Sequence, residues 1–231
     1  MDKISNNIQS KIKNYNNSSD SIVVNTSSIF NIENQIINKT NFIANLGLVN
    51  NIRRVNKFHE NINKFLCPNG IYISCGETLE ERRKRVWQKA PFGFKNSLRV
   101  IDFIFKRVIP KLPIFKKIYF MLTRGHNRVM SSSEIIGRLI SCGFEILETF
   151  EENNILYIIS KKIDIPKFDM NASYGLIFKM DRVGYKGQII KVYKFRTMYP
   201  FSEFLQDYIY NNEGLPNSGD KISNDKRLTS W

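Results

Sequence analysis

Hydrophobic and polar positions in the first third of the chain alternate in ways that predict strands and a helix. The β-branched residues 22–24 predict a strand that leads into a polar loop. Over residues 45–65 apolar side chains recur every three or four positions, which predicts an amphipathic helix. The turn residues 67–70 end this helix, and the apolar run 71–75 predicts a buried strand.

A second helix and a hairpin are predicted further along the chain. Ser131, followed three residues later by Glu134, matches a helix start, and apolar residues continue that helix to Gly143. Residues 144–147 and 155–159 then predict two antiparallel strands around an acidic turn. Strands that alternate with helices indicate an α/β layer.

The polar stretch around Pro166 indicates a change of domain. After it, residues 176–180 and 188–198 predict two strands joined by a glycine-containing hairpin turn, and residues 202–210 predict one short helix. We therefore expect an α/β fold followed by a small α+β segment. The expected divisions are a flexible N-terminus at 1–20, a first domain at 21–162, a linker at 163–171 and a C-terminal part at 172–231.

Composition restricts the class of protein. A chain of 231 residues that is 42% hydrophobic can bury one large core or two small ones. Its three cysteines, Cys67, Cys75 and Cys142, match neither a disulfide framework nor a zinc site, so we expect reduced thiols in a cytoplasmic protein. No secretory signal and no run of about 18 apolar residues is found, so we expect no export and no membrane span.

The net charge of +14 is concentrated in one segment. Residues 82–128 hold fourteen Lys or Arg and a single acid, Asp102, and aromatic residues alternate with the cations. This mixture is typical of a segment that lies in the headgroup layer of an anionic membrane. The residues predicted to contact the membrane surface are Arg83, Lys84, Arg85, Trp87, Lys106, Arg107, Lys116 and Lys117.

Two other interpretations of this basic segment stay open. It can be a solvated basic face over an ordinary core, or it can bind a polyanion such as nucleic acid, because phosphate contacts need only cations. Pro110 and Pro113 break any long helix that would enter a groove. We therefore expect no nucleic acid among the partners.

The first domain resembles the second half of class I methyltransferases. The resemblance is carried by residues 66–70, which are similar to a Leu-x-Pro-Gly-Gly turn before a central strand, and by the Gly143-Phe144 pair before the last hairpin, and it covers about residues 20–162. That family binds its adenosyl cofactor on a Gly-rich loop. Gly47 is the only glycine before Gly70, so the expected role is structural or docking, and methyltransferase activity is the least favoured function.

The C-terminal part is similar to the opening of the bacterial sugar transferase family. The residues that carry this resemblance are Arg-Val-Gly-x-x-Gly at 182–187 and Tyr-Lys-Phe-Arg-Thr-Met at 193–198, and the match covers about residues 172–231. Enzymes of this family transfer a sugar-1-phosphate from a nucleotide sugar to polyprenyl phosphate. The resemblance implies the same partners here and a role in surface-polysaccharide biosynthesis.

Five residues are candidates for binding the phosphates of these substrates. Lys194 and Arg196 are two apart on a strand and share a face, and Arg182 lies across the predicted hairpin. Asp225 and Arg227 match the family's Asp-x-Arg-x-Thr segment and are candidates for the sugar or diphosphate end of the site. The alternatives are an ordinary basic hairpin face and a surface ion pair.

The resemblance also implies what this chain lacks. The family's catalytic Asp-Glu pair, which uses Mg²⁺, follows the Asp-x-Arg-x-Thr segment, and the chain ends at Trp231 before it. We expect no catalytic and no metal-binding residues here, and we do not expect His59 or His126 to be catalytic.

We expect an inactive transferase piece, peripheral on the cytoplasmic face of the bacterial inner membrane. The alternative is a non-catalytic membrane-surface adaptor that binds nucleotide sugar or lipid phosphate.

Overall fold

The computed structural model describes residues 5–16, 20–35, 39–89, 95–167, 177–213 and 225–229. Parts of two predicted segments, the linker at 163–171 and the N-terminus at 1–20, lie outside these residues, as does Leu176 of a predicted strand.

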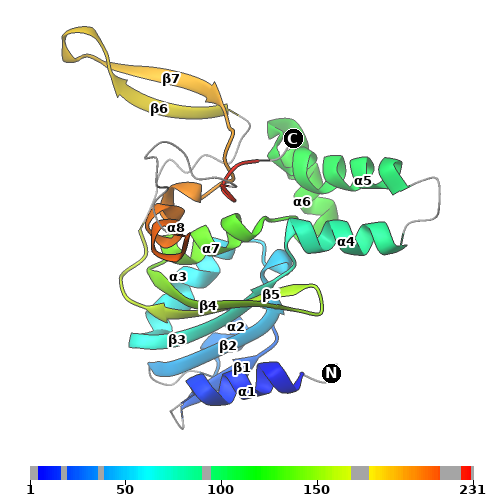
Figure 1. Cartoon of the computed structure of the whole chain (residues 1–231), viewed down its shortest axis with the longest axis vertical. Helices are drawn as coiled ribbons and strands as arrows, with labels where there is room; N and C mark the ends of the chain where they lie inside the picture. The colour runs from blue at the N-terminus through cyan, green and yellow to red at the C-terminus, as the bar shows by residue number, and fades with distance from the viewer. Residues whose placement is uncertain are drawn as a thin grey trace.

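A five-stranded mixed sheet forms the centre of the fold, in the order β1-β2-β3-β5-β4 (Figure 1). The first three strands are parallel, and β5 runs antiparallel to both β3 and β4. The α/β class expected from the sequence is therefore confirmed. The strands are β1 Ser21–Val24, β2 Thr40–Leu48, β3 Leu66–Gly76, β4 Phe144–Glu152 and β5 Ile155–Lys162.

Helices cover both faces of this sheet (Figure 1). Helices α3 (Val55–Phe65) and α7 (Ser132–Ser141) lie on one face and contribute Ile62 and Leu139 to the main core. Helix α1 (Asn6–Tyr15) lies on the other face, and the short α2 spans Phe30–Glu33. The sheet is therefore buried between two helical layers.

Helix α1 corrects the expectation of a flexible N-terminus at residues 1–20. Ile8 and Ile12 lie four positions apart, on one side of the helix, and contact the apolar face of the sheet. The Lys11 ammonium pairs with the Glu148 carboxylate on β4. The ion pair joins residues 137 positions apart, and local sequence does not reveal it.

The helix predicted at residues 45–65 is wrong in its first half. Residues up to Leu48 belong to β2, residues Val49–Asn51 form a 3₁₀ turn, and only Val55–Phe65 is helical. The reason is tertiary: the Asn45 side chain accepts from the Thr26 N–H and donates to the Thr26 carbonyl, each at 3.0 Å. These bonds attach the strand to the loop after β1.

Two local predictions are confirmed. The Ser131 hydroxyl accepts from the Glu134 N–H at 3.1 Å and caps α7. Asn153 and Asn154 both adopt positive φ, as a two-residue hairpin between β4 and β5 requires.

The basic segment folds as a group of helices between β3 and α7 (Figure 1). Pro110 and Pro113 lie in the first turns of η3 and α6, where a proline costs no hydrogen bond. The elements are α4 (Leu79–Lys89), α5 (Lys95–Phe103), the π-helical η2 (Ile104–Val108), η3 (Ile109–Lys111) and α6 (Pro113–Thr123).

The C-terminal part contains the predicted hairpin, formed by β6 (Ile177–Val183) and β7 (Ile189–Phe195) and joined by η4 (Tyr185–Gly187). It projects from the body of the molecule (Figure 1). The predicted helix at 202–210 is a 3₁₀ segment, η5 (Ser202–Leu205), followed by α8 (Gln206–Glu213).

Leu205 and Ile209 belong to the same core cluster as Leu139 of α7. The proposed linker at 163–171 therefore does not separate two independent cores. Its first residues are attached to the first domain, because the Ile163 and Asp164 N–H groups both donate to the Gly143 carbonyl.

Candidate functional site

The structure brings two of the predicted phosphate-binding residues together at the base of the β6–β7 hairpin. Lys194 lies opposite Phe178 in the register of the two strands, and Arg196 follows the end of β7. The Lys194 Nζ lies 5.7 Å from the centroid of the Phe178 ring, and the Arg196 Cζ lies 5.2 Å from it. Both cations thus contact the same aromatic ring.

Arg182 does not join this pair. It lies opposite Ile190, four residues along β6 from Phe178, and a strand rises about 3.3 Å per residue. Arg182 therefore shares the face of the hairpin with Lys194 but lies roughly 13 Å away along it. This corrects the expectation that all three cations converge on one site.

Arg196 is half-buried where the hairpin meets the body of the protein. Burial lowers the pKa of its guanidinium, and the charges of Glu203 and Glu134 act in the opposite direction. A cation that is partly removed from water interacts more strongly with a phosphate than an exposed one does.

Asp225 and Arg227 bind each other. The Arg227 Nε donates to Asp225 Oδ1 at 2.9 Å, and its Nη2 donates to Oδ2 at 2.7 Å. These bonds lower the pKa of Asp225 and raise the pKa of Arg227. In the structure these two side chains therefore form an ion pair with each other, which is the alternative named in the sequence analysis.

The backbone around this ion pair is attached close to Arg196. The Thr229 N–H donates to the Thr197 carbonyl at 2.9 Å, and the Ser133 hydroxyl of α7 donates to the Lys226 carbonyl at 2.6 Å. Four of the five predicted residues, Lys194, Arg196, Asp225 and Arg227, thus lie in segments that meet beside the start of α7.

The loop after β1 is closed by side-chain and backbone contacts. A Cβ on Gly47 would lie 2.5 Å from the Thr26 carbonyl oxygen, so the backbones of these two segments touch. The Thr26 N–H and carbonyl are both bound by Asn45. The residues present do not fit an adenosyl cofactor at this position.

In the described ranges, no three His, Cys, Asp or Glu side chains gather into a group able to hold a metal ion. The Mg²⁺ that the resemblance implies for a complete family enzyme stays a prediction.

The run of four cations at the start of the basic segment is mostly neutralised. Arg82 forms two bonds with Asp102, at 2.8 and 2.9 Å, and also contacts Glu77. Arg85 pairs with Glu77 at 2.6 Å, and the ammonium of Lys84 pairs with Glu81. The Arg82–Asp102 pair joins α4 to α5. Arg83 is the member of the run that has no ion pair with any described residue.

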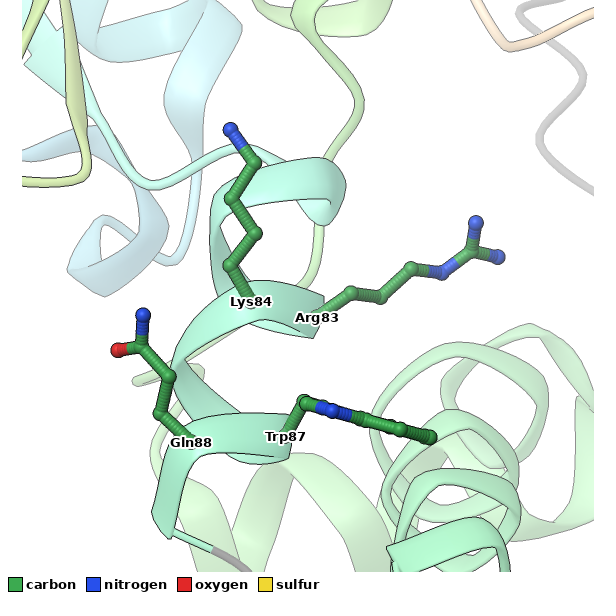
Figure 2. A pocket seen from close by; sticks show the side chains of 4 residues that line it. All are labelled: Arg83, Lys84, Trp87 and Gln88. Carbon is green, nitrogen blue, oxygen red and sulfur yellow. The ribbon is translucent and has the colours of Figure 1, made fainter.

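Arg83, Lys84, Trp87 and Gln88 line an open hollow of about 300 Å³ on α4 (Figure 2). Figure 2 shows the Arg83 guanidinium and the Trp87 indole extending from the same side of the helix. Trp87 is 45% exposed. A cation beside an exposed indole suits the polar layer of a membrane.

The other residues predicted to contact the membrane surface differ in exposure. Lys117 is exposed, whereas Lys106 is half-buried, and this burial lowers its pKa. The side chains of Arg107 and Lys116 lie outside the described part of the structure.

Sequence reasoning missed the aliphatic side chains that this segment exposes. Tyr119 is buried and contacts the rings of Phe105 and Phe120, which holds the helices together. The stripe at 115, 118 and 122 has helical spacing, and this signal was readable in the sequence. The exposed large apolar residues of α5, η2 and α6 are Leu98, Val100, Ile101, Ile104, Phe105, Phe115, Ile118, Met121 and Leu122.

Among the described residues, the structure contains no helix with the length and apolar character needed to cross a bilayer.

Comparisons with known proteins find little. No family model and no curated protein matches the chain. Among solved structures, one described as a possible exported protein from Bordetella parapertussis aligns with a TM-score of 0.33 and 14% identity, over 55% of this chain and 40% of that one. The chain thus spans less than half of that structure's length, and the likeness carries no argument.

Proposed function

We propose that this protein works at the anionic surface of a bacterial membrane, on the cytoplasmic face, in surface-polysaccharide assembly. There it takes part in the transfer of a sugar-1-phosphate from a nucleotide sugar to polyprenyl phosphate. The observation that carries this proposal is the exposed apolar surface of α5, η2 and α6 beside the cations of the same segment.

An exposed apolar surface of this kind is unusual for a soluble monomer and marks a place where something binds. Met121 and Leu122 are 72% and 69% exposed, and Lys117 lies one turn before Met121 on α6. In an anionic membrane each nearby Lys or Arg contributes about 1 kcal/mol, and apolar side chains are removed from water. The two effects act together, so the helices lie along the lipid surface.

The Lys194–Arg196 pair supports a role in holding phosphate. Both cations contact the Phe178 ring, and a guanidinium binds phosphate oxygens through two parallel hydrogen bonds. The sugar transferase resemblance comes from these same residues.

A non-catalytic adaptor that binds nucleotide sugar or lipid phosphate is the second candidate. The observation that favours it is the ion pair of Asp225 with Arg227, because these family-motif residues bind each other. Methyltransferase activity is the third, and the close contact of Gly47 with Thr26 opposes it.

Flotation with lipid vesicles tests the membrane role. We expect the full chain to bind phosphatidylcholine vesicles that contain 30% phosphatidylglycerol, and to bind pure phosphatidylcholine weakly. Replacing Met121 and Leu122 with Ser removes about 2 kcal/mol or more of apolar transfer, so we expect binding to fall about thirtyfold or more. Ile165→Ser, at another exposed position, is the matched control. Equal binding by the double variant and the control would refute the proposal.

Calorimetric titration with UDP-glucose and UDP-N-acetylglucosamine tests the phosphate site. We expect Arg196→Ala to weaken binding about tenfold or more, since hydrogen bonds to charged groups contribute about 1.5–3 kcal/mol. Arg182→Ala removes the same group from the same hairpin, far from the pair, and should bind as the unchanged protein does. Equal losses in the two variants, or no binding at all, would contradict the assignment. Binding without turnover on added polyprenyl phosphate and Mg²⁺ supports the adaptor.

A further inference from the structure

The β6–β7 hairpin stands away from the body of the molecule, and no other helix or strand of the described residues covers either of its faces (Figure 1). Its residues are exposed or half-buried throughout, and Tyr185 and Phe195 are 84% and 80% exposed. An isolated two-stranded hairpin is only marginally stable in water. The exposed large apolar residues are Ile177, Val183, Tyr185, Ile189, Ile190, Tyr193 and Phe195.

The charge of the hairpin selects an anionic partner. Between residues 177 and 196 there is one acid, Asp181, which lies opposite Lys191 in the register of the two strands. Apolar and aromatic side chains interleaved with cations have the same chemistry as the surface of α5 and α6. The six cations of the segment are Lys179, Arg182, Lys186, Lys191, Lys194 and Arg196.

The free strand edges determine how deep such a hairpin can lie in a lipid bilayer. The two strands form a sheet of their own, so each has one edge whose N–H and C=O groups have no strand of the described residues beside them. Unpaired backbone groups are excluded from the hydrocarbon core, where no water can bind them. At the headgroup layer water is still present, and Lys side chains extend to the lipid phosphates while aromatic rings lie at the interface.

The hairpin and the basic helices are separate protrusions. In Figure 1 the hairpin lies at the upper left and α5 at the right, and both are above the five-stranded sheet. A flat surface placed above the molecule in this view therefore faces both protrusions, because the sheet and the helices that cover it lie below them.

We infer that the β6–β7 hairpin is a second contact with the same anionic phospholipid surface, and that it lies in the headgroup layer. This inference rests on the proposed membrane role of the basic helices. Its consequence is that Lys194 and Arg196, at the base of the hairpin, lie at the depth of the lipid phosphates. A phosphate-bearing lipid then reaches the two cations without leaving the membrane.

Tryptophan fluorescence separates the two contacts. The chain has two tryptophans, so Trp231→Phe leaves Trp87 as a reporter of the basic helices. Adding Trp87→Phe and Tyr185→Trp to this variant moves the reporter to the hairpin. With vesicles of phosphatidylcholine, 30% phosphatidylglycerol and a brominated phospholipid, we expect both reporters to shift to the blue and to be quenched.

Charge removal tests the contact independently. Lys186→Gln with Lys191→Gln should weaken vesicle binding about fivefold for each cation, the equivalent of about 1 kcal/mol per charge. Lys57→Gln with Lys64→Gln removes the same charge from exposed positions of α3 and should weaken binding much less.

The outcomes distinguish failure of this inference from failure of the proposed function. Quenching of the Trp87 reporter with no change at Tyr185→Trp overturns the second contact and leaves the first. A blue shift at Tyr185→Trp without lipid, with a dimer in light scattering, overturns it in favour of a second copy of the chain as the occupant. No response of either reporter, with no vesicle binding, refutes the membrane role itself.

Discussion

His59 is a core residue whose ring makes aromatic contacts. It is fully buried, with ring centroids 6.1 Å from Phe58 and 5.7 Å from Tyr72. Neither ring nitrogen has a hydrogen-bond partner among the described residues. Burial, with the charge of Arg138 adding to it, lowers the pKa of His59 to about 3, so the ring is neutral in the folded protein.

This burial predicts a pH-dependent loss of stability. The unfolded chain binds a proton at His59 below about pH 6.5 and the folded chain only near pH 3, so the free energy of unfolding falls by about 1.4 kcal/mol per pH unit across that window. We expect the His59→Phe variant to lack this slope. The change that the substitution makes to the free energy of unfolding should therefore be about 2 kcal/mol more favourable at pH 5 than at pH 8. Urea unfolding at both values measures it.

His126→Phe, the same substitution at an exposed position, is the control for the change of side chain itself. An unchanged slope in His59→Phe would show that the ring titrates normally in the fold.

Two of the three thiols are buried. Cys67, Cys75 and Cys142 are all free, and burial raises the pKa of Cys75 and of Cys142 to about 12. These two thiols are therefore unreactive packing groups.

At the scale of elements, α7 connects the first domain to the C-terminal part. The Arg138 guanidinium lies 4.4 Å from the centroid of the Phe201 ring and pairs with Glu134 at 2.7 Å. Gly137 faces the Phe201 backbone so closely that a Cβ would lie 2.4 Å from its carbonyl oxygen. The missing side chain at position 137 is what allows η5 to approach the helix.

Gly137→Ala tests this contact. In an open helix the change stabilises by up to about 1 kcal/mol, whereas here overpacking costs about 1–3 kcal/mol, so we expect net destabilisation. Hydrogen exchange should show faster exchange in η5 and α8. Lys64→Ala, exposed on α3, is the control for helix propensity. A Gly137→Ala protein that is more stable than the original would show that the close approach does not hold in solution.

The whole molecule has one continuous main core. Tyr199 and Phe201 are buried, and Leu205 and Ile209 lie in the same cluster as the residues of α3 and α7. The first domain and the C-terminal part on either side of the polar linker therefore stabilise each other. The β6–β7 hairpin is the portion that stands apart from this core.

Cutting the chain after Lys167 should therefore destabilise what remains. Each large apolar side chain removed from a buried site costs about 1.5–3 kcal/mol, so we expect the free energy of unfolding to fall by at least about 3 kcal/mol. Denaturant unfolding of the shortened and the full chain measures the difference. An unchanged midpoint would show that residues 21–162 are an independent domain, as the sequence suggested.

The sequence alone was sufficient for elements whose signals are local. The Ser131 cap, the asparagines at 153 and 154 and the glycines of the β6–β7 turn act on residues within a few positions, so α7 and both hairpins were predictable. The basic segment was equally visible, because charge can be counted without a fold. The adjacency of Lys194 and Arg196 follows from the period of a strand.

Only the tertiary structure decided features that depend on residues far apart in the chain. Residues 40–48 form a strand because they pair with β1 on one side and β3 on the other, and Asn45 also binds Thr26, nineteen positions away. Strand register places Arg182 away from Lys194, and the attachment of Lys226 to Ser133 joins segments 93 positions apart. Propensity and periodicity act over one or two turns of chain, whereas burial and hydrogen bonding between distant segments choose among the structures that those local signals allow.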